Sequence, residues 1–87
     1  MLDEFLNVKV VIDLASSYVC LGKLVRYDGT FLELKGADIH DLRDTQTTRE
    51  NYVVSAVRTG IRKNRRSVLV RIAEVVAIAR LEDVPSD

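Results

Sequence analysis

The sequence has little of several residue types, and each shortage narrows the range of functions. Cysteine occurs once, at Cys20, so no disulfide can form within the chain, and its place in an apolar segment favours a reducing compartment. Histidine also occurs once, at His40, which leaves no pair of imidazoles for a metal site. Thirteen basic and thirteen acidic side chains give a formal net charge of zero, so no overall field attracts nucleic acid or membranes.

Long apolar runs are missing as well. The first residues, Met1 to Leu6, are acidic and contain no extended apolar stretch, so we expect neither a secretory signal nor a membrane span. A chain of 87 residues is long enough for one small domain that buries roughly 60% of its unfolded surface. We therefore expect a single cytoplasmic domain over residues 1–87, without internal repeats and without membrane contact.

The stretch from Val19 to Ala37 predicts a bent antiparallel hairpin. Asp28 and Gly29 mark its turn, because this dipeptide tolerates positive φ. After the turn, apolar and polar residues alternate as in a strand with one buried face. The first strand carries apolar residues on both faces, so we expect it to be covered on both sides. Gly22 lies inside it and predicts a bulge or a sharp bend, which lets one strand serve two halves of a small barrel.

Three further strands are predicted around this hairpin. Apolar residues alternate from Val8 to Leu14 and again from Ser67 to Ile72, and the stretch from Val75 to Leu81 is apolar on both faces. Residues 2–6 predict a short helical turn. Five short strands in so small a chain predict a mainly β fold, a strongly bent and partly open antiparallel barrel of the SH3-like kind.

An insert at about residues 39–66 separates the third and fourth strands and contains a helix. Thr47 to Glu50 matches a capping box with Thr47 as the capping residue, and Gly60 suits the left-handed position past the end. A helix from about Thr48 to Thr59 follows. Arg62 to Arg66, here named the basic segment, is predicted to be a solvated turn.

Two motifs in this order resemble those of the Sm and Sm-like (LSm) family. The first has a strand glycine, a leucine two residues later and an aromatic-Asp pair at the hairpin. The second has an Ile-Arg-Gly followed at fixed spacing by two aliphatic residues. The matching residues are Gly22, Leu24, Tyr27 and Asp28 for the first motif and Val70, Arg71, Val75 and Ile78 for the second. The resemblance covers about Val8 to Asp83 except for the insert.

The resemblance implies an Sm-fold barrel that forms a homo-oligomeric ring and binds RNA. In the family, an Asn after the hairpin Asp and the Arg-Gly of the second motif hold a nucleotide base at the ring pore. Here Asp28 and Arg71 match that set, no Asn follows the hairpin Asp, and Ile72 stands in place of the glycine. The resemblance also implies a ring contact between the fourth strand of one subunit and the fifth strand of the next.

The strand edges favour such a ring independently. An open barrel leaves two edges unpaired, and the last predicted strand carries no proline and only Arg80 as a charge. A head-to-tail contact between copies closes into a ring when the rotation between subunits allows it. The alternative is a monomer in which the helix caps the open edge.

Candidate RNA contacts come from the hairpin, the basic segment and the second motif. Phe31 offers a flat face for stacking a base, or packs against a neighbouring side chain instead. The basic segment, with Arg58 nearby, predicts a positive rim for phosphates, although a solvated turn or pairing with acidic residues of another subunit are alternatives. The candidate RNA-binding residues are Asp28, Phe31, Arg62, Lys63, Arg65, Arg66 and Arg71.

Catalysis is not predicted. His40, Asp41 and Asp44 match no metal-ligand spacing, and Ser16 and Ser17 have no histidine near them in the sequence, so we expect neither an enzyme nor a cofactor. The alternative function is a non-catalytic oligomeric adaptor that binds a protein partner through the helical insert. It would use the exposed side of Tyr52 or Val54, and it gains support if Val54 is exposed.

Overall fold

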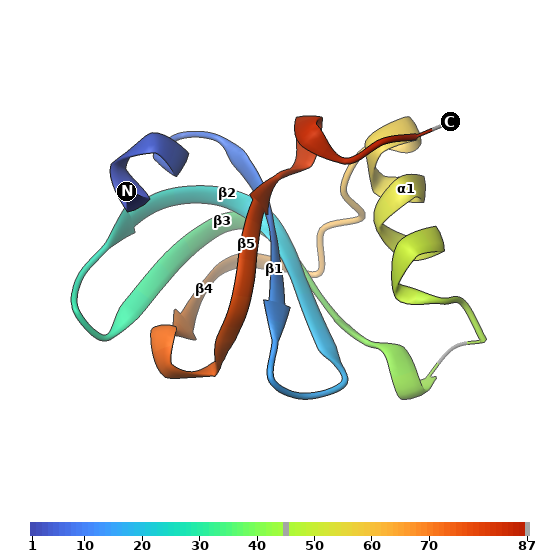
Figure 1. The fold of residues 1–87 in the computed structure, drawn as a ribbon, viewed down its shortest axis with the longest axis horizontal. Coiled ribbons are helices and arrows are strands. Elements are labelled where there is room, and N and C mark those ends of the chain that lie inside the picture. The colour runs from blue at the N-terminus through green and yellow to red at the C-terminus, as the bar shows by residue number, and fades with distance from the viewer. Residues whose placement is uncertain (45, 87) are drawn as a thin grey trace.

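The computed structural model describes residues 1–44 and 46–86, and its centre is one antiparallel sheet of five strands. The strands follow the order β4-β3-β2-β1-β5, and the sheet curls strongly upon itself (Figure 1). The expected mainly β, strongly bent five-stranded fold is therefore confirmed. Its elements are a 3-10 turn at Leu2–Phe5, β1 (Lys9–Leu14), β2 (Tyr18–Tyr27), β3 (Phe31–Asp41), α1 (Arg49–Thr59), β4 (Arg65–Arg71) and β5 (Val75–Arg80).

The interior of the barrel is filled by alternate residues of the strands. The largest contributors are aliphatic side chains without solvent exposure, and they are joined by the single cysteine. Burial raises the pKa of the Cys20 thiol to about 12, so the thiol packs as a small apolar group. The fully or almost fully buried members are Val10, Ile12, Cys20, Leu24, Leu32, Leu34, Ala37 and Val70.

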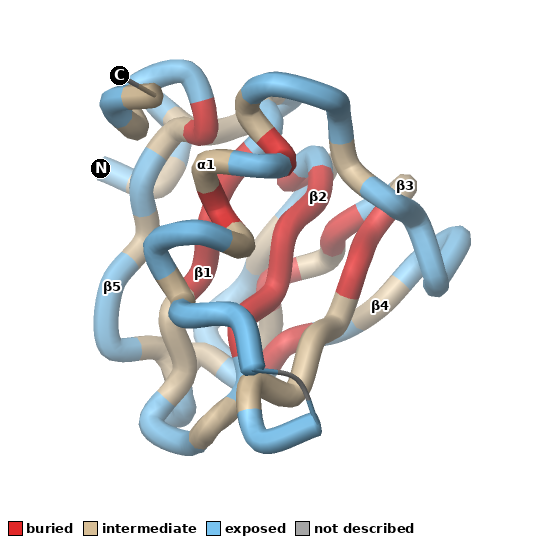
Figure 2. The backbone as a smooth tube through the Cα atoms, turned by 90° about the vertical axis from the view of Figure 1, so that its right-hand side faces the viewer, coloured by how far each residue is buried: buried red, intermediate tan, exposed pale blue. Residues whose placement is uncertain are grey.

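A second apolar cluster lies on the outer face of the sheet. Val11, Val19 and Leu21 point away from the barrel interior and pack against Val53 and Ala56 of α1. Figure 2 shows α1 lying over β1 and β2, which therefore have apolar neighbours on both faces, as predicted for the first hairpin strand. The helix covers this outer face and neither of the two edge strands, so the predicted alternative of a helix capping the open edge is not what the structure shows.

A bulge opposite Gly22 reverses the faces of β3. Leu21 pairs with Asp38 and Lys23 pairs with Lys35, so Gly22 alone faces two residues of β3. A bulge at this place was predicted, but the extra residue belongs to β3, where Gly36 has a φ of 57°. Beyond the bulge, Asp38 faces outward toward α1 although the alternation before it would have turned this position inward.

The ends of α1 agree with the prediction to within one residue. Thr48, not Thr47, caps the helix, because its Oγ1 accepts a hydrogen bond from the amide of Asn51 at 3.1 Å. The capping-box pattern favoured Thr47 because Glu50 follows it by three residues, whereas the residue three after Thr48 is Asn51. At the other end, Gly60 has the predicted positive φ, 91°, and its amide donates to the carbonyl of Ala56 at 2.9 Å.

The two edge strands each have one neighbour in the described part of the chain. β4 pairs with β3 and β5 pairs with β1, which leaves one edge of each strand without a partner strand. Leu69 on β4 is 55% exposed and Val76 on β5 is 69% exposed, and both are large apolar residues. In the described ranges, no helix is long and apolar enough to cross a membrane.

Candidate nucleic-acid interface

Asp28 closes the β2–β3 turn with its side chain. Its Oδ1 accepts hydrogen bonds from the amides of Thr30 at 2.7 Å and Phe31 at 2.8 Å, and its own amide donates to the carbonyl of Phe31 at 3.0 Å. These backbone amides lower the pKa of the Asp28 carboxyl. Gly29 does not have positive φ, so the reason given for the Asp-Gly turn is wrong although its location is right. Asp28 thus fixes the shape of the turn.

The turn brings Phe31 beside Arg71. The two residues are direct cross-strand partners of β3 and β4, and the amide of Ile72 donates to the carbonyl of Thr30 at 2.8 Å. Phe31 is half-buried, and Arg71 is exposed. A surface hollow of about 180 Å³ adjoins Phe31. It is lined by Arg26, Tyr27, Asp28, Phe31, Glu33 and Leu69.

This end of the barrel presents an aromatic face next to cations. The Arg26 guanidinium holds Glu33 in an ion pair and is the main cause of the lowered pKa of that carboxyl. Glu33 also accepts a hydrogen bond from Ser67 at 3.2 Å, so its charge is compensated. Arg71 makes no ion pair with any described residue. An aromatic ring can stack on a nucleotide base, and a guanidinium beside it that forms no ion pair can contact the phosphate of the same nucleotide.

The basic segment is fastened to β3 by Asn64. The backbone amide of Asn64 donates a hydrogen bond to the carbonyl of Ala37 at 2.9 Å. The Asn64 side chain accepts from the backbone amide of Ile39 at 3.0 Å and donates to the Ile39 carbonyl at 2.9 Å. The prediction of a solvated turn is wrong for Arg65 and Arg66, because β4 begins at Arg65. All four predicted basic side chains are exposed. They are Arg62, Lys63, Arg65 and Arg66.

The predicted site residues therefore form two groups. Arg65 pairs with Ala37 and Arg71 pairs with Phe31, so the groups lie at opposite ends of β4. Six residue steps at about 3.3 Å each separate them by about 20 Å. Figure 1 shows the β2–β3 turn at the end of the molecule opposite to α1. The structure joins Asp28, Phe31 and Arg71 and leaves the basic segment apart.

Lysines that the sequence analysis did not single out gather near the basic segment. Lys63 lies over Gly36, where a β-carbon would be 3.2 Å from its Cε. Here Lys63 borders a hollow of about 380 Å³, named below the lysine hollow, which is lined by Lys9, Lys23, Lys35, Gly36, Gly60, Ile61 and Lys63. In sequence, each strand lysine is one polar position in an alternating strand, and only the strand register places these lysines together.

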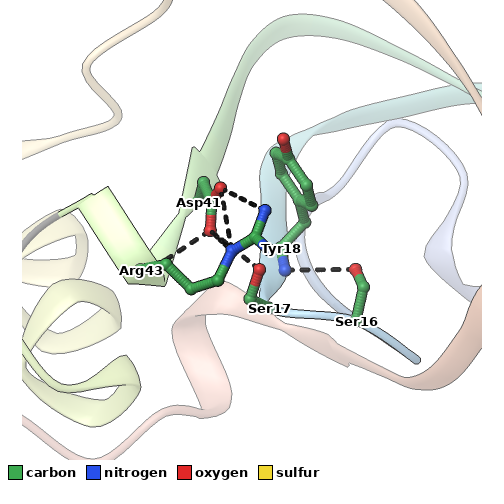
Figure 3. Close-up of polar contacts among 5 residues, drawn as sticks. All are labelled: Ser16, Ser17, Tyr18, Asp41 and Arg43. Atoms are coloured by element: carbon green, nitrogen blue, oxygen red, sulfur yellow. Dashed lines mark hydrogen bonds and ion pairs between the residues drawn. The ribbon is translucent and has the colours of Figure 1, made fainter.

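The acidic candidates serve structural purposes. Figure 3 shows Asp41 accepting hydrogen bonds from Ser17 Oγ at 2.8 Å and from the side chain and amide of Arg43 at 2.9 and 3.0 Å. Arg43 is the main cause of a strongly lowered pKa of the Asp41 carboxyl. These bonds tie the β1–β2 turn to the end of β3, consistent with turn chemistry at Ser16 and Ser17. In the described residues, no three His, Cys, Asp or Glu side chains lie close enough to hold a metal ion.

Of the two residues proposed for protein binding, Tyr52 makes contacts within the molecule. Tyr52 stacks on His40 with ring centroids 4.3 Å apart, and its hydroxyl donates to Asp38. Burial is the main cause of a strongly raised pKa of the Tyr52 phenol. Val54 is half-buried, so it does not give the adaptor the exposed apolar position that would have favoured it.

Comparisons with known proteins agree on the fold. No family model and no curated protein matches the chain. Among solved structures, it is similar to a Pyrococcus abyssii Sm protein in complex with a uridine heptamer, with a TM-score of 0.62 and 18% identity over 91% of this chain and 90% of the other. It is also similar to a chain of a NatC complex bound to CoA, with a TM-score of 0.60 and 17% identity over 92% and 83% of the two chains. The chain thus has an Sm-like fold, as the two motifs predicted.

Proposed function

We propose that this protein binds single-stranded RNA as a homo-oligomeric ring. The observation that carries the proposal is that Phe31 lies opposite Arg71 on the neighbouring strand, beside the β2–β3 turn of an Sm-like fold. Arg71 forms no ion pair with a described residue. The Pyrococcus abyssii Sm protein of this fold was solved with a uridine heptamer. In this chain, Phe31 stacks on a base, Arg71 contacts the adjacent phosphate, and Asp28 keeps the turn in the required shape.

The ring forms when β4 of one subunit pairs with β5 of the next. Each of these strands has one unpaired edge, and unpaired edges are templates for further strand pairing. Exposed Leu69 and Val76 lie on the two edge strands and become covered in this arrangement. The contact joins two different surfaces, and such a head-to-tail contact closes into a ring when the rotation between subunits allows it.

Native mass spectrometry tests the ring. The wild-type chain is expected to give one closed oligomer, and Val76→Glu is expected to give monomers, because a charge on the free edge opposes strand pairing. Val76 is 69% exposed in the single chain, so the variant should keep its circular dichroism spectrum. A folded wild-type monomer at tens of micromolar would contradict the ring.

Fluorescence anisotropy with 12-nucleotide oligo(U) and oligo(A) tests the RNA contacts. Phe31→Leu is expected to weaken binding by about 1 to 3 kcal/mol through lost stacking, and Arg71→Ala is expected to weaken it further at low salt. Replacing the four cations of the basic segment by alanine should abolish RNA retention without dissolving the ring. Arg43→Ala is the control, because Arg43 is already paired with Asp41. Unchanged affinity in all three variants at low salt would reject these contacts.

The adaptor remains the second candidate, and the similarity to a chain of a NatC complex favours it. In that case the fold would serve a protein assembly through the insert around α1. The RNA titration separates the two functions, since an adaptor that has lost nucleotide binding would form its oligomer but retain neither oligonucleotide at 50 mM salt.

A further inference from the structure

All four lysines of the chain line one hollow. The sequence contains lysine only at positions 9, 23, 35 and 63, and each of these side chains borders the lysine hollow of about 380 Å³. They come from β1, β2, β3 and the connection after α1, which are far apart in the sequence. The chain has no net charge, so this gathering is a local feature and does not reflect an overall excess of cations.

The strand register places three of these lysines in one row. Lys9 is the direct partner of Lys23, and Lys23 is the direct partner of Lys35. Like charges directly opposite each other on neighbouring strands destabilise a sheet. The row is therefore expected to destabilise the fold, and an anionic ligand would relieve the repulsion.

The fourth lysine reaches the row because Gly36 has no side chain. The Lys63 Cε lies 3.2 Å and the Nζ 3.7 Å from the place that a β-carbon of Gly36 would occupy. The bulge at Gly36 and the Asn64 anchor thus bring Lys63 against the lysines of the strands.

Among the residues that the structure describes, none that lines the lysine hollow is acidic. None of the four lysines forms an ion pair with a described carboxylate. Glu33 is two residues from Lys35 but is held by Arg26 and Ser67. Glu82 borders a different hollow, which it shares with Lys9. The ammonium groups are therefore available to an external anion.

The lining also indicates which part of a nucleic acid fits. The lysine hollow contains no aromatic side chain and no carboxylate or amide that could read a base edge. Lysine ammonium groups are compact charges that suit phosphate oxygens. On β3, Phe31 and Lys35 share the outer face, about 13 Å apart at 3.3 Å per residue, with the compensated Glu33 between them.

We propose that the lysine hollow binds phosphates of the RNA backbone, so that one subunit holds a strand at two places, by a base at Phe31 and by adjacent phosphates over Lys35, Lys23 and Lys9. This inference rests on the proposed RNA binding and assigns it a second contact, one that does not read sequence. The shared chemistry is a run of adjacent phosphates, which a free polyphosphate also offers, so the test includes both sources.

The test compares two variants with the same change in charge. Lys23→Gln with Lys35→Gln removes two charges from the row, and Arg43→Gln with Arg49→Gln removes two charges that are paired with Asp41 and Asp13. Anisotropy with 12-nucleotide oligo(U) and oligo(A) is measured from 50 to 300 mM salt. The lysine variant should lose at least fivefold in affinity for both oligonucleotides at 50 mM, and the arginine variant should stay within twofold of wild type.

Two further readouts separate binding from a structural role. The log–log salt slope of the lysine variant should fall by about 0.7 for each lost phosphate contact. Its melting temperature should stay equal or rise, because opposed like charges have been relieved. A lower melting temperature together with unchanged RNA affinity would overturn the proposal and leave the lysines a role in folding.

Reductive methylation of the lysines, read by mass spectrometry, distinguishes the phosphate sources. The 12-nucleotide RNA should protect Lys23 and Lys35, and inorganic tripolyphosphate at equal ionic strength should protect them less. Protection by tripolyphosphate alone would overturn the RNA assignment.

The anisotropy measurements distinguish failure of this inference from failure of the proposed function. If the wild-type chain binds RNA and the two variants do not differ, only this inference is overturned. If the wild-type chain does not bind RNA at 50 mM salt, the proposed function is overturned as well.

Discussion

The two faces of the sheet bury apolar residues by different means. The inner cluster is made by the strands themselves, and six of its aliphatic side chains are at most 1% exposed, namely Val10, Ile12, Leu24, Leu32, Leu34 and Ala37. The outer cluster depends on α1 and on the turn after β5, and its contributions from these elements, Val53, Ala56 and Leu81, are 5–7% exposed. The barrel is therefore closed by its own strands, and the helix is an addition to it.

The two clusters are expected to contribute unequally to the stability of the fold. The inner cluster contains almost no polar atoms, whereas the outer one borders Asp38, Tyr52 and His40, which satisfy each other by a hydrogen bond and ring stacking. Because polar contacts and partial exposure reduce the net gain from burial, we expect the helix side to be the weaker one.

The largest expected effect is on the inner cluster. Leu34 has no solvent exposure, so Leu34→Ala should lower the free energy of unfolding by about 2 to 5 kcal/mol, through lost transfer energy and the cavity left behind. Urea unfolding followed by circular dichroism measures the loss. A change below 1 kcal/mol would mean that the interior is packed less tightly than described.

A smaller effect is expected on the outer cluster. Val53→Ala removes two methyl groups at the α1 contact and should cost about 1.5 to 2 kcal/mol. The exposed helix variant Ser55→Ala is the control and should change stability little. If Val53→Ala destabilised the chain as much as Leu34→Ala does, the two faces would be equally important and the comparison would fail.

A substitution at the β3 bulge should lower the stability less than either of the two core substitutions. Gly36→Ala places a β-carbon at a φ of 57°, which L-residues adopt at a penalty of about 1 kcal/mol. Gly29→Ala is the matched control, because its φ is not positive and nothing lies within 4 Å of the added carbon. Thermal unfolding should show a lower melting temperature for the Gly36 variant alone.

The smallest expected effect is the pH dependence of the stabilisation by Asp41. The pKa of Asp41 is lower in the folded chain than in the unfolded one, so its stabilisation is complete above the ordinary Asp pKa of about 4 and is lost as pH falls through the folded value. The difference in melting temperature between the wild type and Asp41→Asn should therefore shrink between pH 7 and pH 2. A difference that stayed constant over this range would mean that the Arg43 pair does not contribute.

Much of the barrel was predictable because strand alternation records which face is buried. Leu32 and Leu34 alternate with polar residues and lie inside, and the apolar residues of both parities in β2 are indeed covered on both sides. The Sm-like resemblance rested on the order and separation of two motifs. Two residues of the first motif have a clear structural role, since Gly22 packs closely against Ala37 and Asp28 closes the turn.

The site was less predictable because register and bulges decide it. An extra residue at Gly36 shifts every later residue of β3 to the other face, and the sequence analysis assigned the bulge to Gly22 of the neighbouring strand instead. The row of Lys9, Lys23 and Lys35 could not be predicted either, because only the strand register places these three lysines opposite one another. Asn64 was overlooked because its role consists of hydrogen bonds to a strand that lies 25 residues earlier.

The Asn64 anchor has a consequence for partial unfolding. Because its bonds fix the chain to Ala37 and Ile39 just before β4 begins, we expect residues 42–44 and 46–63 to detach as one cooperative unit while the barrel persists. Amide protons of α1 should then exchange with deuterium orders of magnitude sooner than those of β2. The detached form would expose the apolar side chains of Val11, Val19 and Leu21, so it would be prone to aggregate.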